Sequence, residues 1–230
     1  IKSVNQTIPA LLAISRQQTS DERENDTIAQ FSSGYVEHAN ADRLKMLLES
    51  YGSDKASRHD YYQAYARILG DGQDVKKIFE IGLGTNNIDV VSTMGRGGRP
   101  GASLRAFRDF CPNATVYGAD FDKRILFDEE RIQSFFVDQT DPHTFPAVGD
   151  KVGRDFDLMI DDGLHAPNAN LHSLAFFLPR IRVGGWAVVE DIAPQSEQVW
   201  WVASRLLPAA YESYLLRGRS AMLFLVHRTA

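Results

Sequence analysis

The chain has 230 residues, 43% of them hydrophobic and 24% charged, which is typical of one sizeable globular domain. Its formal net charge of −5 provides no basic field that would favour a nucleic acid or an anionic membrane as partner. No apolar run approaches the ~20 residues of a membrane span. The single cysteine, Cys111, excludes an internal disulfide. We therefore expect a cytoplasmic protein that acts on a small molecule. The chain begins with Ile1, as a trimmed chain or an excised domain would.

The first part of the chain shows helical spacing and no strand pattern. Apolar residues recur at helical intervals near residues 11–14, 26–31 and 44–48. We interpret residues 1–70 as a helical N-terminal cap or lid, which also offers a contact for a homo-oligomer. Residues 71–230 then form the main domain.

Within this cap, the segment Tyr51-Gly52-Ser53-Asp54-Lys55 marks a boundary between two helices. Gly52 can end the first helix, and Ser53 or Asp54 can cap the second. The polar and aromatic residues that follow fit either an ordinary helix pair with an aromatic face or a lid that closes over a ligand.

From residue 76 onward, strand patterns alternate with helical patterns. We predict five strands, at residues 76–81, 115–120, 132–137, 157–160 and 186–189. Helices are predicted between and after them, at residues 103–110, 122–129, 167–178 and 196–207. This alternation predicts a parallel sheet with helices on both faces.

The last two strand-like segments, 211–216 and 221–227, are joined by a tight turn and should pair antiparallel. The predicted fold is therefore α/β: a Rossmann-like, doubly wound sheet of five parallel strands plus a C-terminal antiparallel hairpin, with an N-terminal helical cap. A glycine-rich basic loop over residues 92–102 fits either a mobile lid with anion-binding character or a disordered insertion.

The carboxyl ends of the first three strands carry a pattern that suits an adenosine. Ligands of open parallel sheets bind outside these ends. Gly82 and Gly84 follow Glu80 at the first end, where glycine lets the backbone approach a ligand closely. At the second, Asp120 can accept both hydroxyls of a ribose. Asp138 and the neighbouring Gln139, at the third, can bond an adenine amine.

A dinucleotide is a poorer match to the same strand ends. Asn87 stands where the dinucleotide fingerprint requires its third glycine. An NAD-dependent oxidoreductase is therefore a weaker alternative.

The last two parallel strands end in acidic residues. Asp161 and Asp162 end one strand, with His165 shortly after, and Glu190 and Asp191 end the next. Side by side, these groups would converge on one edge and favour a cation or a polar ligand. The simpler alternatives are that Asp162 and Asp191 cap the following helices and that His165 bonds a carboxylate.

Together, these motifs resemble those of class I S-adenosylmethionine-dependent methyltransferases over roughly residues 50–230. The segments around Ser53, Asp138, Asp162 and Glu190 are similar to those of metal-dependent macrolide sugar O-methyltransferases and their cephalosporin-hydroxylase-like relatives. The resemblance implies S-adenosylmethionine as cofactor and a small-molecule hydroxyl, on a sugar or natural-product intermediate, as acceptor.

The resemblance also implies roles for single residues. Asp162, Glu190 and Asp191 would hold Mg²⁺, or Mn²⁺ or Fe²⁺ in its place. His165 would be the base, with Asp162 as the second catalytic residue. Asp161 would lie near the methionine part of the cofactor. The other cofactor-binding candidates are Ser53, Lys55, Glu80, Gly82, Gly84, Asp120, Asp138 and Gln139. The main alternative is an iron- or manganese-dependent C-methyltransferase domain that acts on a carrier-bound acyl group.

Overall fold

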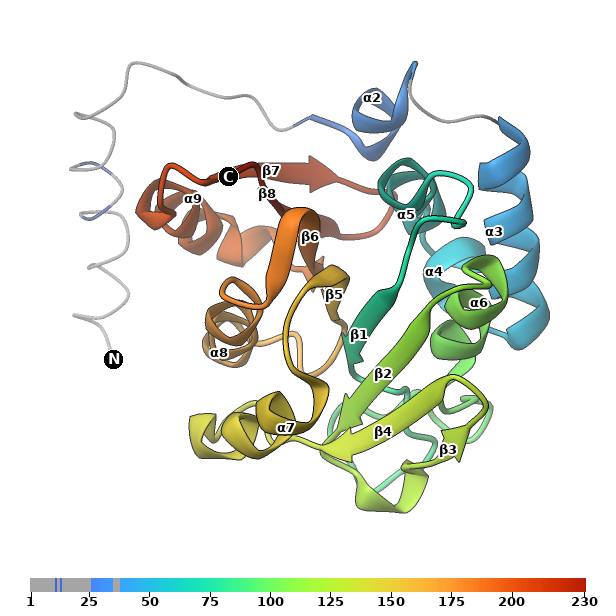
Figure 1. Cartoon of the computed structure of the whole chain (residues 1–230). Helices are drawn as coiled ribbons and strands as arrows, with labels where there is room; N and C mark the ends of the chain where they lie inside the picture. The colour runs from blue at the N-terminus through green and yellow to red at the C-terminus, as the bar shows by residue number, and fades with distance from the viewer. Residues whose placement is uncertain (1–10, 12, 14–25, 35–37) are drawn as a thin grey trace.

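The structure is a computed structural model that describes residues 11, 13, 26–34 and 38–230. One eight-stranded sheet, in the order β3-β4-β2-β1-β5-β6-β8-β7, forms the centre of the fold, and helices lie on both of its faces (Figure 1). The strands are β1 Lys77–Ile81, β2 Thr115–Asp120, β3 Asp128–Glu129, β4 Ile132–Phe136, β5 Phe156–Asp161, β6 Ile181–Ile192, β7 Tyr211–Arg217 and β8 Met222–Arg228. The helices are α2 Ile28–Ser32, α3 His38–Tyr51, α4 Asp54–Ser57, α5 Tyr61–Leu69, α6 Ala102–Phe110, α7 Phe145–Val152, α8 Pro167–Phe177 and α9 Glu197–Leu206.

The pairing confirms the predicted sheet. Strands β4, β2, β1, β5 and β6 pair with one another in that order, and all four of these pairings are parallel. β8 pairs antiparallel with β6, and β7 pairs antiparallel with β8. The C-terminal hairpin therefore extends the sheet beyond its five parallel strands, with β7 at the edge.

The predicted helix over residues 122–129 is wrong. This segment forms a single 3-10 turn at Lys123–Ile125, and the short strand Asp128–Glu129 then pairs antiparallel with β4. The Asp122 side chain accepts a hydrogen bond from the Arg124 backbone N–H, which caps a turn rather than a full helix. The Ser134 side chain bonds both backbone groups of Phe127, so the chain is held extended there.

Helix α7, Phe145–Val152, was not predicted. Pro146 stands in its first turn, where proline needs no N–H partner, and Gly149 lies in its interior. Both residues mask the helical signal in the sequence. The predicted helical segment at residues 11–14 falls mostly outside the described residues.

Alternation along the central strands builds two cores. Ile78 of β1 and Leu158 of β5 pack with α2 to α6, whereas Phe79 and Met159 pack with α7 to α9. Cys111 lies in the first core. Burial raises the pKa of its thiol to about 12, which makes it a packing residue rather than a nucleophile.

The N-terminal helices share the first core with the sheet. Leu44 and Leu48 of α3 and Tyr61 and Tyr65 of α5 are fully buried in the same cluster as Ile78. None of the helices among the described residues has the length and hydrophobicity that a membrane span requires.

Candidate active site

A cleft of about 600 Å³ opens at the carboxyl ends of the parallel strands. Of the residues predicted from the sequence, the following line it: Ser53, Gly82, Gly84, Asp120, Asp138, Gln139, Asp162, His165 and Asp191. The other four, Glu80, Lys55, Asp161 and Glu190, are buried behind this lining. The volume lies in the usual range for a small-molecule site.

The turn after β1 requires glycine at its first position. Gly82 has a φ of +97°, and a Cβ atom there would lie 2.0 Å from the backbone oxygen of Asp162. The backbone of the turn is therefore packed directly against the end of β5. This contact couples the glycine turn to the acidic end of the cleft.

Asp120, the predicted ribose acid, is held by backbone donors. Its carboxylate accepts from the N–H of Leu83 at 2.7 Å and from the N–H of Asp122 at 2.7 Å. These bonds fix the carboxylate at the cleft wall.

Asp122 is a cleft residue that the sequence analysis missed. It accepts hydrogen bonds from Thr85 Oγ1 at 2.6 Å, Asn87 Nδ2 at 2.7 Å and Arg124 Nε at 2.7 Å. The hydrogen bonds from Arg124 lower the pKa of the Asp122 carboxyl well below its usual range. In the sequence, the sign of this contact is Asn87, which stands where the dinucleotide fingerprint has its third glycine. Its side chain donates to the Asp122 carboxylate.

The predicted adenine residues lie at the end of β4, in two different environments. Asp138 is partly exposed in the cleft, and its Oδ1 accepts from the N–H of Thr140 at 2.9 Å. Gln139 faces inward: its Nε2 donates to Asp161 Oδ1 at 2.8 Å, and its Oε1 accepts from the N–H of Leu164 at 2.8 Å. Gln139 thus shapes the loop after β5.

Asp161 is likewise turned away from the cleft. It is fully buried and also accepts from Asn170 Nδ2 at 3.0 Å. Its described contacts anchor the β5–α8 loop that carries Asp162 and His165.

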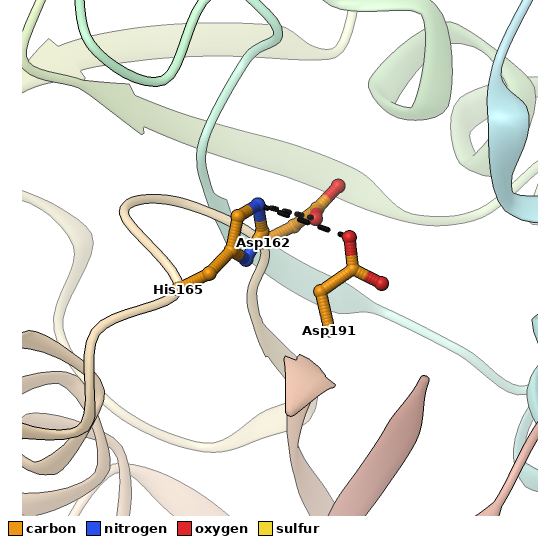
Figure 2. A group of neighbouring side chains, drawn as sticks. All are labelled: Asp162, His165 and Asp191. Atoms are coloured by element: carbon orange, nitrogen blue, oxygen red, sulfur yellow. Dashed lines mark ion pairs between the residues drawn. The ribbon is translucent and has the colours of Figure 1, made fainter. Parts of the chain in front are cut away.

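Asp162, His165 and Asp191 form a cluster after β5 and β6 (Figure 2). These strands lie on the other side of β1 from β2, which ends in Asp120. His165 Nε2 lies 3.9 Å from Asp162 Oδ1 and 3.9 Å from Asp191 Oδ2. One ligand atom from each residue lies within 4.8 Å of the others. His165 and Asp191 adopt φ values of +55° and +54°, which non-glycine residues rarely do and which are concentrated at functional sites.

Lys55 supplies a buried positive charge behind this cluster. Its side chain is 2% exposed, and its ammonium lies 2.5 Å from Asp162 Oδ2, 2.7 Å from Glu190 Oε2 and 3.1 Å from Glu80 Oε1. Burial alone would lower the pKa of Lys55, but the three carboxylates raise it well above its usual value. Lys55 is therefore charged and compensates the acidic group. Lys55 lies in α4, and the Ser53 side chain caps the N-terminus of that helix by accepting from the Lys55 backbone N–H.

Two tyrosines of α5 complete the support. Tyr61 donates to Asp191 Oδ1 at 2.6 Å, and Tyr65 donates to Glu190 Oε1. Glu190 therefore has both oxygens bonded, one to Tyr65 and one to Lys55. Burial raises the pKa of its carboxyl well above the usual value, and Lys55 opposes that shift.

The atoms that remain open toward the cleft suit a cation. Asp162 Oδ2 is bonded to Lys55 and Asp191 Oδ1 to Tyr61, while Asp162 Oδ1 and Asp191 Oδ2 have only His165 nearby among the described residues. Two carboxylate oxygens that face one cleft match the way proteins hold Mg²⁺ or Mn²⁺, with the remaining positions left for water and substrate.

No protein-family model matches the chain. The chain is similar to the 8-demethyl-8-alpha-L-rhamnosyl tetracenomycin-C 2'-O-methyltransferase of Streptomyces olivaceus, with 30% identity over 143 residues, 62% of this chain and 35% of the relative. It is also similar to the mycinamicin VI 2''-O-methyltransferase of Micromonospora griseorubida, with 38% identity over 93 residues, 40% of this chain and 23% of the relative.

Among solved structures, the MycE methyltransferase from the mycinamycin pathway, in complex with Mg, SAH and mycinamycin VI, superposes with a TM-score of 0.61. The identity is 22%, and the match covers 81% of this chain and 54% of that chain. The chain has the class I methyltransferase fold. It is a homologue of macrolide and tetracenomycin sugar O-methyltransferases, which confirms the resemblance predicted from the sequence. It spans well under two thirds of the length of these curated relatives.

Proposed function

We propose that this domain is an S-adenosylmethionine-dependent, divalent-metal-dependent O-methyltransferase that acts on a hydroxyl of a sugar or natural-product intermediate. The observation that carries the proposal is the cleft itself. In a class I methyltransferase fold, it joins a glycine turn and Asp120 at one end to the Asp162, His165 and Asp191 cluster at the other. The first end suits an adenosine, and the second suits a metal-assisted acceptor.

At the donor end, S-adenosylmethionine would supply a methyl group linked to a sulfonium. Gly82 and Gly84 let the chain approach it closely, and Asp120 lies where ribose hydroxyls can donate to it. Asp138 and the cleft-facing part of Gln139 border the same space. The buried candidates Lys55, Glu80 and Asp161 would support the cofactor site from behind, through the Ser53 helix and the loop after β5.

At the acceptor end, we propose Asp162, Glu190 and Asp191 as metal ligands. Asp162 and Asp191 have open oxygens, whereas Glu190 would join them only by sharing the oxygen that Lys55 binds. A cation bound there would lower the pKa of an acceptor hydroxyl and orient it. His165, whose Nε2 faces both open oxygens, then takes the hydroxyl proton as the general base.

Two alternatives are less well supported. The relatives are named as sugar O-methyltransferases, which favours an oxygen acceptor over the carrier-bound carbon of a C-methyltransferase. NAD is disfavoured because Asn87 occupies the third glycine position and binds Asp122. A cytoplasmic location, the absence of a nucleic-acid partner, the division at residue 70 and a homo-oligomer through the N-terminal helices stay predictions.

Calorimetry tests the cofactor class. We expect S-adenosylhomocysteine to bind the purified chain and NAD not to bind it. Binding of NAD without binding of S-adenosylhomocysteine would overturn the proposal. Methyl transfer from labelled S-adenosylmethionine to glycosylated polyketides, with and without Mg²⁺, then tests the reaction and its need for the metal.

Replacing His165 by alanine tests the assignment of the base. The turnover number should fall about 10²- to 10⁴-fold, the range that general base catalysis supplies. Binding of S-adenosylhomocysteine and of Mn²⁺ should stay within about twofold of wild type. The exposed His143→Ala variant is the matched control and should keep full turnover. Loss of Mn²⁺ binding in His165→Ala would instead make His165 a metal ligand.

A further inference from the structure

Arg99 is a positively charged residue of the cleft that has no role in the proposed reaction as described above. It lies in the glycine-rich loop before α6 and lines the cleft. The other lining arginine, Arg124, is bonded to Asp122 and Asp89. Among the described residues, no carboxylate or carbonyl group bonds the Arg99 guanidinium. Arg99 is therefore available to a ligand.

The position of Arg99 is set by Gly52, at the start of the segment that carries Lys55. A Cβ atom on Gly52, whose φ is +84°, would lie 2.9 Å from Arg99 Cδ and 3.3 Å from Arg99 Nε. The arginine side chain thus lies flat on the Gly52 backbone. Lys55, three residues after Gly52, binds Asp162, so Arg99 contacts the start of the segment that reaches the acidic group.

The charge of the cleft lining makes this cation significant. Among the residues that the structure describes, seven aspartates and two arginines line the cleft. The ammonium and sulfonium groups of S-adenosylmethionine suit such a lining, but its carboxylate does not. An anionic group is stable there only where a cation meets it, and guanidinium is the side chain best matched to a carboxylate.

We propose that Arg99 binds the carboxylate of the methionine portion of S-adenosylmethionine, and so selects an intact amino-acid tail. This assignment rests on the proposed function. It makes the glycine-rich basic loop a part of the cofactor site, with Arg99 closing over the tail from the Gly52 side.

The test compares two ligands that differ only in the carboxylate: S-adenosylhomocysteine and its decarboxylated analogue. By calorimetry, wild type should bind the intact ligand about 10- to 100-fold more tightly, as a charge-assisted hydrogen bond implies. Arg99→Met should lose most of that preference by weakening only the intact ligand. Its unchanged affinity for the analogue also shows that the variant is folded. Arg96→Met, an exposed arginine of the same loop outside the cleft lining, should keep the preference.

Other outcomes overturn the assignment. Equal weakening of both ligands in Arg99→Met would assign Arg99 to the shape of the loop, and unchanged affinity for both would leave its charge without a role in cofactor binding. If wild type bound the two ligands equally, the carboxylate would not be recognised, and the proposed function would stand without this inference. If wild type bound neither ligand, the proposed function itself would fail.

Discussion

Lys55 provides the positive charge that lets Glu80, Asp162 and Glu190 share one end of the cleft. Its ammonium contacts all three carboxylates and has almost no exposure to water. A buried charge that loses its partner is costly, because the remaining charges are neither paired nor solvated. Lys55 therefore holds the open oxygen of Asp162 in place from behind.

Replacing Lys55 by methionine should lower the free energy of unfolding by about 3–5 kcal/mol, the usual effect of breaking a buried ion pair. Urea unfolding measures this loss. The matched control is Lys76→Met at an exposed lysine, which should change stability by less than about 0.5 kcal/mol. Stability equal to wild type in Lys55→Met would show that the three carboxylates do not need this partner.

The lowered pKa of Asp122 predicts how the stability of the folded chain depends on pH. Its pKa is lower in the folded chain than in the unfolded chain, mainly through Arg124, so it contributes stability above the unfolded value. That contribution is lost as the pH falls through and below about 4. Asp122→Asn should therefore be less stable than wild type, by about 1–2 kcal/mol at pH 7, and the difference should shrink towards pH 2.

Thermal unfolding across this pH range checks the prediction. Asp42→Asn, at an exposed aspartate with no described side-chain bond, should show no such dependence. A stability difference for Asp122→Asn that stays constant from pH 7 to pH 2 would contradict the role of its charge.

At the level of elements, the turn between β1 and α6 connects the two halves of the cleft. The Gly82 backbone packs on the Asp162 carbonyl, and the Gly101 N–H donates to the Leu83 carbonyl at 2.7 Å. The loop between them leaves the sheet and returns to start α6, and it carries Arg99 to the cleft. Small shifts in this turn should therefore move both the cofactor side and the metal side.

Gly82→Ala should be strongly disruptive because the added Cβ meets the Asp162 carbonyl and because φ is +97°. We expect a loss of about 2–4 kcal/mol in stability, together with weaker binding of S-adenosylhomocysteine. Gly97→Ala is the matched control, since its Cβ would meet nothing within 4 Å and its φ is not in the positive region. Calorimetry and thermal unfolding of the two variants check this, and equal behaviour would refute the contact.

The sequence predicted the elements whose signals are local. Apolar runs that end in glycine or carboxylate identified all five parallel strands, and the turn before Ala221 identified the hairpin. The helix over 122–129 failed because Asp122 and Ser134 bond the backbone and hold a turn and an edge strand instead. Helix α7 was missed because Pro146 and Gly149 hide its pattern.

The sequence predicted where the site lies on the sheet, but it predicted only some of the contacts between the side chains there. Strand ends brought Asp162, His165 and Asp191 together, as parallel topology requires. The inward orientation of Glu190 towards Lys55 and Tyr65 depends on how the N-terminal helices pack, and spacing along the chain carries no signal for it. The same holds for Tyr61 on Asp191.

For the whole molecule, the two ends of the cleft are built by different parts of the chain. Sheet and glycine turn form the donor end, whereas α4 and α5 supply Lys55, Tyr61 and Tyr65 to the acidic end. The N-terminal helices thus direct one oxygen of Asp162 and one of Asp191 into the cleft. We therefore expect these oxygens to hold a cation beside the methionine end of the cofactor.

Paramagnetic broadening of S-adenosylhomocysteine protons by Mn²⁺ can test for this cation, because it reports whether metal and cofactor occupy one cleft. With wild type, Mn²⁺ should broaden the homocysteine methylene resonances more than those of adenine. The effect should disappear in Asp191→Asn, while S-adenosylhomocysteine still binds. Absence of broadening in wild type, or broadening that survives in both Asp162→Asn and Asp191→Asn, would contradict the account.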